Sequence, residues 1–175
     1  FQNVQTINLS SVRFKNIISL TSPIRQINNR ITNTQLTIKD AFISNCTVQS
    51  DGAVLFSEGG INMSISNSSF LNNFASKKGG VFYFRNCSGN LAINNNFFQS
   101  NMATKGASSI YFNCIDSGIL DANTDLLENN KFYRDVDDPS LPLIATAPVY
   151  YKLALSASVN ENNFDNSSLL KNEKK

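Results

Sequence analysis

The sequence predicts an all-β protein built as a parallel β-solenoid, in which each rung takes about 28 residues. A Phe-x-x-Asn motif recurs at constant spacing, a short alternating strand precedes each copy, and an apolar strand follows it. No segment has a sustained apolar helical period, so helices should be few and short. One rung of this length cannot bury its own inner face, so the rungs must stack with their strands pairing in parallel.

The motif occurs three times at one constant interval, and Phe14 lies one interval before the first copy. A fixed period places like residues above like, which predicts an internal column of phenylalanines beside a column of asparagines. Buried asparagines are stable when each side-chain amide bonds to the next asparagine and to the backbone of the turn. The predicted phenylalanine column is Phe14, Phe42, Phe70 and Phe98, and the predicted asparagine ladder is Asn45, Asn73 and Asn101.

Two further features accompany each copy of the motif. The strand before each motif alternates apolar and polar residues, and the strand after it is almost entirely apolar. The alternating strands are Leu36-Thr37-Ile38, Met63-Ser64-Ile65 and Leu91-Ala92-Ile93, and the apolar strands are Gly52 to Phe56, Gly80 to Phe84 and Ser108 to Phe112. Each rung should therefore contain a strand, a turn, a short strand, a glycine-rich turn and an apolar strand.

We expect a single domain over residues 1–175, as a fragment of a longer chain, with regular rungs over about 8–119. The regularity decays after Asn101, although Leu127 to Asn130 lies near the next expected motif, slightly late in the register. Residues 134–148 are rich in aspartate and proline and predict an irregular loop that leaves the solenoid. The last rung or edge is expected over about 149–170.

Composition excludes several classes of function. The 15 Lys and Arg are nearly balanced by 13 Asp and Glu, and the basic residues are scattered singly apart from Lys77-Lys78 and Lys174-Lys175, which argues against a nucleic-acid partner. Histidine is absent, which removes the commonest zinc ligand and every Ser-His or Cys-His nucleophile pair. Apolar residues make up 41% of the chain and include 13 Phe, which is enough for a packed core.

We expect an extracellular or cell-surface location reached through the secretory pathway. The most apolar stretch, Leu141 to Val159, is interrupted by two prolines and a lysine, so no membrane span is predicted. The chain starts at Phe1 without Met, and a signal peptide, which cannot be seen here, would be cleaved or lie outside this fragment. Six Asn-x-Ser/Thr sequons would accept glycans in that pathway: Asn8, Asn45, Asn62, Asn67, Asn86 and Asn166. A ladder residue cannot carry a glycan, so Asn45 should stay bare, and Asn67, Asn86 and Asn166 are the predicted sites.

The three cysteines allow one bridge. The separation of Cys87 and Cys114 along the chain is just short of one repeat, so their Cα atoms can lie on neighbouring rungs at a separation that a disulfide tolerates. The alternative is that both are buried thiols, which behave as small apolar side chains. Cys46 has no partner in this register.

Carboxylates decide whether a catalytic site is present, because glycan-cleaving sites need them clustered on one outer face. Most acidic residues lie in the last third of the sequence, and none in the regular rungs recurs in the next rung. Asp135, Asp137 and Asp138 are a candidate Ca²⁺ site, and the alternative is a solvated acidic loop beside Pro139. We therefore predict no catalytic residue and no cofactor.

Adjacent aromatic residues lie in two of the apolar strands. Tyr83 with Phe84, and Tyr111 with Phe112, are compatible with an aromatic stripe that binds sugar. Successive side chains of a strand point to opposite faces, so one member of each pair must face the core. Core packing is the commoner role of phenylalanine.

The motif followed by Gly-Gly and an apolar strand, as in Phe70-Leu71-Asn72-Asn73 with Gly79-Gly80-Val81-Phe82, resembles the repeat of the chlamydial polymorphic membrane proteins and of large ciliate surface proteins. More broadly, it resembles the pectin-lyase-like right-handed parallel β-helix. The resemblance covers about residues 36–115. It departs where Gly-Gly is reduced to Asp51-Gly52 and to Ala107-Ser108.

This resemblance implies a non-catalytic structural or adhesive surface protein, a scaffold element of a coat, a filament or a larger assembly. A parallel solenoid has unpaired strand edges at both ends, so we expect other subunits or further chain to dock there, and glycans are a further candidate partner. The alternatives are a polysaccharide-acting enzyme and a glycan-binding module.

Overall fold

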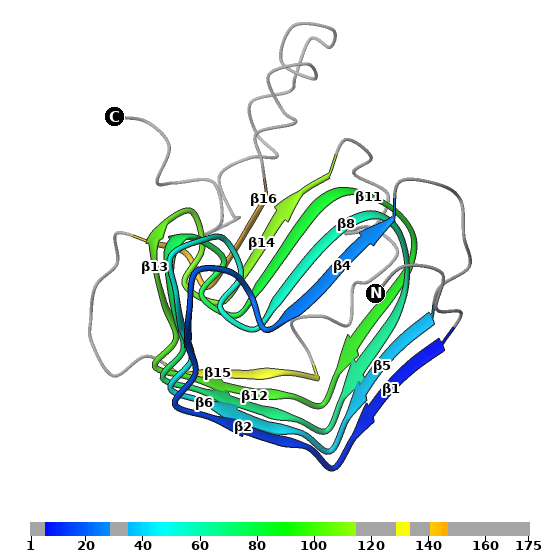
Figure 1. Ribbon diagram of the computed structural model, residues 1–175, viewed down its shortest axis with the longest axis horizontal. Coiled ribbons are helices and arrows are strands. Elements are labelled where there is room, and N and C mark those ends of the chain that lie inside the picture. Colours follow the sequence, from blue (N-terminus) through cyan, green and yellow to red (C-terminus); the bar gives the residue numbers. More distant parts are fainter. Residues whose placement is uncertain (1–5, 29–34, 115–128, 134–140, 147–175) are drawn as a thin grey trace, which may run out of the picture.

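The computed structural model describes residues 6–28, 35–114, 129–133 and 141–146. These residues form sixteen strands and no helix (Figure 1). The strands pair in parallel into three sheets that wrap around one interior (Figure 1). The predicted all-β parallel solenoid, with about 28 residues per rung, is confirmed.

Each rung passes through the three sheets in the same order and returns to the first. Sheet A contains β1 (Thr6–Ser10), β4 (Ile24–Asn28), β5 (Gln35–Lys39), β8 (Leu55–Ser66), β11 (Phe82–Asn94), β14 (Ile110–Asn113) and β16 (Ile144–Thr146). Sheet B contains β2 (Arg13–Lys15), β6 (Phe42–Ser44), β9 (Ser69–Leu71), β12 (Phe97–Gln99) and β15 (Lys131–Tyr133). Sheet C contains β3 (Ile18–Ser19), β7 (Thr47–Val48), β10 (Phe74–Lys78) and β13 (Met102–Lys105).

We number the rungs by their sheet B strands, from rung 1 with β2 to rung 5 with β15. Rung 1 consists of β1 to β4, and rungs 2 to 4 follow without interruption to β14. The long strands β8 and β11 each end one rung and begin the next: β8 pairs with β4 through Leu55–Gly59 and with β5 through Asn62–Ser66. Strand β16, paired with β14, lies inside the segment predicted to be an irregular loop, and that prediction was wrong for residues 144–146. The predicted last rung at 149–170 lies outside the described residues.

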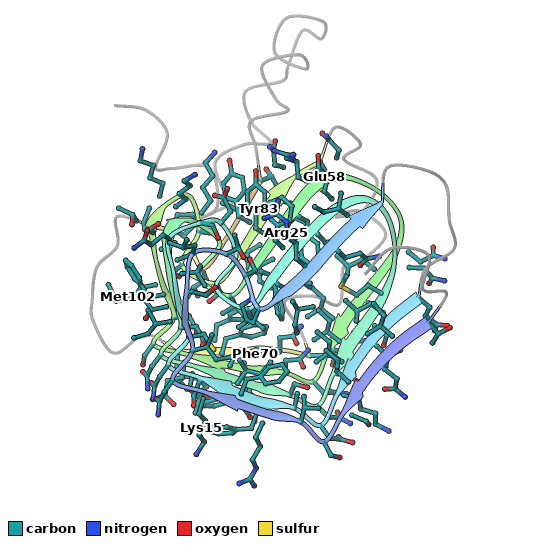
Figure 2. The ribbon with its side chains drawn as sticks, viewed as in Figure 1. Lys15, Arg25, Glu58, Phe70, Tyr83 and Met102 are labelled. Atoms are coloured by element: carbon teal, nitrogen blue, oxygen red, sulfur yellow. The ribbon has the colours of Figure 1, made fainter. Side chains whose placement is uncertain are left out.

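An aromatic column runs through the interior of sheet B. Phe70 pairs with Phe98 and Phe98 with Phe132, with ring centroids 5.1 and 4.7 Å apart and nearly parallel planes. Figure 2 shows Phe70 inside the coil and Lys15, from the same sheet, pointing away from it. Phe82 of sheet A packs edge-on against Phe70 at 4.8 Å, so the two sheets interlock at the centre of the core.

Phe42 does not belong to this column, and its predicted place was wrong by a single position. The residue between Phe14 and Phe70 is Ile43, which is fully buried, whereas Phe42 faces outward between Arg13 and Ser69. The interval from Phe14 to Ile43 is therefore longer than the interval from Ile43 to Phe70, and the repeat is not constant in the first rungs. The number of residues per rung increases again after a bulge between Arg85 and Ser88. This bulge makes β11 longer than β8.

The same shift removes Asn45 from the predicted ladder. Asn45 is exposed and has a positive φ of 55°, and its side chain donates to the Asn16 side chain at 3.1 Å. The buried position beside it belongs to Cys46, which lies level with Asn73. The ladder position thus reads Cys46, Asn73 and Asn101 in rungs 2 to 4.

Each corner beside sheet B is made by a pair of residues with distinct roles. The first is left-handed and outward, and the second faces inward at a ladder position. Asparagine suits the first role because it tolerates positive φ better than most side chains. The left-handed positions are Ser11, Asp40, Asn67 and Asn95 between sheets A and B, and Asn16, Asn45, Asn72 and Ser100 between sheets B and C.

Every ladder asparagine bonds to the rung before it in the same way. Asn73 Oδ1 accepts from the backbone N–H of Cys46 at 3.0 Å, and its Nδ2 donates to the carbonyl of Ile43 at 3.2 Å. Asn101 does the same for the N–H of Asn73 and the carbonyl of Phe70. Asn73 Nδ2 also donates to Asn101 Oδ1 at 3.0 Å, which links the two side chains directly. The bonds to the backbone therefore replace strand pairing where the chain turns a corner.

A second ladder, absent from the sequence-based prediction, lies at the corner between sheets A and B. Asn130 accepts from the backbone N–H of Asn96 at 2.9 Å and donates to the carbonyl of Ile93 at 2.8 Å. Asn96 bonds in turn to the N–H of Ser68 and the carbonyl of Ile65. Asn129-Asn130 therefore matches Asn95-Asn96, and its expected place in the Phe-x-x-Asn position was wrong.

Cys46 continues the first ladder without the full set of bonds. Its thiol donates to the carbonyl of Ser44, with Sγ 3.8 Å from that oxygen, instead of making the two bonds to the preceding rung that an asparagine makes. Burial raises the pKa of the Cys46 thiol, and a backbone hydrogen bond with Ile17 opposes that shift. In later rungs, the ladder asparagine Nδ2 donates to a backbone carbonyl of the preceding rung, that of Ile43 or Phe70. The carbonyl at the equivalent position beside Cys46 is that of Phe14.

We expect Asn73→Ala to lower the free energy of unfolding by roughly 3 kcal/mol, because orphaned buried groups cost about 1–3 kcal/mol each. The N–H of Cys46 and the carbonyl of Ile43 would lose their partner. Urea unfolding followed by circular dichroism measures the change. The control Asn72→Gly alters the exposed, left-handed neighbour and should be nearly neutral; equal losses in both variants would contradict the ladder role.

We expect Cys46→Asn to raise the free energy of unfolding by about 1 kcal/mol, because it adds one buried hydrogen bond to the Phe14 carbonyl. Cys46→Ala, which removes a fully buried sulfur and its hydrogen bond to the Ser44 carbonyl, should be less stable than the parent protein. Thermal and urea unfolding rank the three proteins. A Cys46→Asn protein less stable than Cys46→Ala would show that this position cannot hold a ladder residue.

Candidate functional site

The outer face of sheet A carries an aromatic column of its own. Phe56, Tyr83 and Tyr111 lie on successive strands, with centroids 5.5 and 5.7 Å apart along the stack. Phe84 and Phe112 face the core instead, stacked at 5.1 Å. One member of each adjacent aromatic pair was expected to face the core. In both pairs the phenylalanine faces the core and the tyrosine faces outward.

Three cations flank this column. The Arg25 guanidinium lies 4.6 Å from the centroid of the Phe56 ring, and that of Arg85 lies 5.7 Å from it. Lys78 Nζ lies 4.5 Å from the Tyr111 centroid and 3.1 Å from the Tyr111 hydroxyl.

Figure 2 shows Arg25 and Tyr83 together with Glu58, over the part of sheet A formed by β4, β8 and β11. The repeat does not reveal the Arg25 contact, because Arg25 and Phe56 are farther apart along the chain than one regular period. Only the pairing of β4 with β8 places these two side chains together.

The rings of this column are covered although they lie on an outer face. Phe56, Tyr83 and Tyr111 are only 5–6% exposed. Both faces of the Tyr83 ring are occupied, by Phe56 and by Tyr111. Sugar binding by stacking needs a free ring face, so the candidate stripe at Tyr83 and Tyr111 forms a second, outer core instead.

Glycine makes room for the column at the corner between sheets C and A. Gly106 has a φ of 74°, and a Cβ there would lie 2.6 Å from the Tyr111 ring. Gly52 and Gly79 adopt the same left-handed conformation in the preceding rungs. The glycine position is thus Gly52, Gly79 and Gly106, and the predicted alignment of Gly52 with Gly80 and Ser108 was wrong.

The environment of this column changes the pKa of two groups. Burial raises the pKa of Tyr83, against a hydrogen bond from Asn113 Nδ2 to its hydroxyl at 3.1 Å. For Lys78, partial burial lowers the pKa, but the hydrogen bond and charge interaction with Tyr111 outweigh it and raise the pKa. Both shifts stabilise the protonated forms, a neutral phenol and an ammonium.

Two of the three described carboxylates have structural partners. Glu58 forms an ion pair with Arg85 at 2.6 Å, and Asp51 Oδ1 accepts the backbone N–H of Lys78 at 3.0 Å. Asp40 is the exposed left-handed residue of a corner. Among the described residues, no three Cys, Asp or Glu side chains gather as a metal site would require. Asp135, Asp137 and Asp138 lie outside the described residues.

All five described sequons have an exposed asparagine: Asn8, Asn45, Asn62, Asn67 and Asn86. The reason for expecting Asn45 to stay bare was wrong, because Cys46 and not Asn45 lies in the buried ladder. Glycosylation at Asn67 and Asn86 stays a prediction, and Asn166 lies outside the described residues.

The cysteines differ in state. Cys46 is a buried free thiol, and Cys114 is disulfide-bonded. Arg85 and Asn113, which lie close to Cys87 and Cys114 in the sequence, pair across β11 and β14. The side chain of Cys87 lies outside the described residues, so the Cys87–Cys114 bridge stays a prediction.

In the part of the chain that the structure describes, no helix is long and apolar enough to cross a membrane. Comparison with known proteins finds no matching family model, curated protein or solved structure.

We expect Tyr83→Phe to reduce the loss of stability at alkaline pH. The folded state raises the pKa of Tyr83, so this residue contributes stability below the unfolded pKa of about 10, and the contribution disappears as pH rises through the folded pKa. Urea unfolding between pH 8 and about 11 should show a flatter profile for the variant. Identical profiles for the two proteins would contradict the assigned shift.

Proposed function

We propose that this chain is a non-catalytic, extracellular structural or adhesive element, which forms a stiff segment of a surface coat, filament or larger assembly. The observation that carries the proposal is the unbroken stacking of the interior. One column runs through five rungs as Phe14, Ile43, Phe70, Phe98 and Phe132. Side chains in register along the whole axis resist bending, as a display scaffold requires.

Exposure of the five described sequons supports a secretory location, because glycan acceptors must be accessible. We infer further that the coil is right-handed and of the polymorphic-membrane-protein or pectin-lyase-like type. The repeated order of elements supports this type of coil: an alternating strand, a corner asparagine pair, a short strand, a glycine turn and an apolar strand. Other subunits, or further chain, are the proposed partners at the strand edges of the two end rungs.

We expect the full chain to release no product from a panel of acidic and neutral polysaccharides. Reducing-end and unsaturated-product assays measure hydrolysis and lyase activity separately. The triple variant Asp135→Asn, Asp137→Asn and Asp138→Asn controls for the acidic segment outside the described residues. Product release by the parent protein that this variant abolishes, with its circular dichroism spectrum unchanged, would overturn the non-catalytic proposal.

A further inference from the structure

Three buried polar atoms in the first two rungs of the core have no hydrogen-bond partner in the protein. They are Nε2 and Oε1 of the Gln26 side chain and Oγ of the Ser57 side chain. Gln26 is 4% exposed and Ser57 is 0% exposed, so bulk solvent does not reach either group. Within the described residues, no other fully buried side-chain nitrogen or oxygen lacks a partner, which makes these two side chains an exception.

The two side chains are direct neighbours. Gln26 lies in β4 of rung 1 and pairs with Ser57 in β8 of rung 2, and neighbouring strands are about 4.8 Å apart. The residues just before them, Arg25 and Phe56, face outward, so Gln26 and Ser57 point into the core. The carboxamide and the hydroxyl therefore face the same part of the interior.

Side chains at this position are much larger in the next two rungs. Ser57 pairs with Phe84, and Phe84 pairs with Phe112, and both rings are buried in the core. A hydroxymethyl group fills far less of the interior than a benzyl group, so Ser57 leaves room for a small molecule where rung 3 holds a ring. The adjacent inward column stays large and apolar through the same rungs, with Ile24, Leu55, Phe82 and Ile110. The change in size and polarity is thus confined to the column of Gln26 and Ser57.

The donors and acceptors at this position match a neutral ligand that forms hydrogen bonds. The carboxamide offers two N–H donors and a carbonyl acceptor, and the hydroxyl both donates and accepts. No charged side chain is among the buried residues of the described part, so an ion would have no counter-charge here. Water meets both conditions, and a buried water typically bonds to about three polar groups that the chain leaves unpaired.

We propose that the core binds ordered water between β4 and β8. The water donates to Gln26 Oε1 and accepts from Gln26 Nε2–H, and the Ser57 hydroxyl completes its hydrogen bonding. This hydration gives all three atoms a partner and removes the cost of burying them unpaired. The site goes beyond the proposed scaffold function, and it differs from the asparagine ladders, whose side chains bond to the backbone of the preceding rung.

Nuclear magnetic resonance of the full chain tests the proposal with water itself as the probe. In isotope-labelled protein, the side-chain N–H signals of Gln26 are assigned as those that Gln26→Leu removes. We expect these protons to show cross-peaks with water whose NOE and ROE have opposite signs, because the water is bound and long-lived. The sign of the ROE also separates this contact from proton exchange. Absence of such cross-peaks for both Gln26 side-chain protons would overturn the proposal.

Unfolding by urea distinguishes hydrated groups from unpaired ones. Gln26→Leu with Ser57→Ala removes all three polar atoms, and if these atoms bond to water, the unfolding midpoint should stay the same or fall. A clear rise of the midpoint, which the removal of unpaired buried groups would produce, contradicts the proposal. The matched control Gln49→Leu with Ser76→Ala makes the same changes at more accessible positions along sheet C and corrects for their general effect.

Ser57→Val tests whether the hydroxyl is part of the site. The variant replaces the hydroxyl with a methyl group and adds a second methyl. We expect the cross-peaks between Gln26 and water to weaken or disappear, because the water loses one partner and part of its space. Unchanged cross-peaks in a variant whose circular dichroism spectrum matches that of the parent protein would overturn the assignment of Ser57.

Discussion

The structure depends on the hydrogen bonds that buried asparagines form with the preceding rung. Strands pair their own backbone groups, but at each corner of a solenoid the N–H and C=O groups turn away from the ladder while remaining buried. Asn73, Asn96, Asn101 and Asn130 satisfy one N–H and one C=O each, and all are at most 6% exposed. By contrast, Gln26 and Ser57, which pair across β4 and β8, are buried side chains of the described part that find no hydrogen-bond partner.

Two parallel aromatic arrangements follow from the alternation of side chains along sheet A. Phe82 and Phe84 face the common core, while Tyr83 between them faces outward and joins Phe56 and Tyr111. The outer column stays covered because cations lie over its ends and left-handed glycines leave space at the corner. On sheet B, by contrast, Tyr133 is 52% exposed, and Phe42 and Phe97 are half-buried.

Much of the architecture could be predicted from the sequence, because the period and the alternating strands are local patterns. The exact register could not. Phe42 and Ile43 are both apolar, and only the pairing of rungs shows that Ile43 is the buried one. Asn72 and Asn73 are likewise the same residue type but have opposite roles, because Asn72 adopts a positive φ and Asn73 is buried. The contact of Arg25 with the Phe56 ring depends on the longer first rung, and no repeat spacing reveals it.

Both asparagine ladders have the same direction, because each side chain satisfies backbone groups of the rung on its amino-terminal side. A newly synthesised rung therefore carries the asparagine side chains that bond to the backbone of the rung already made. Synthesis on the ribosome also proceeds from the amino terminus. Rungs can therefore assemble in the order of synthesis, and each rung is stabilised by hydrogen bonds from the next rung as that rung emerges. In the described rungs, the early core is completed by the next rung and not by a distant segment, which limits the time that unpaired strands are open to aggregation.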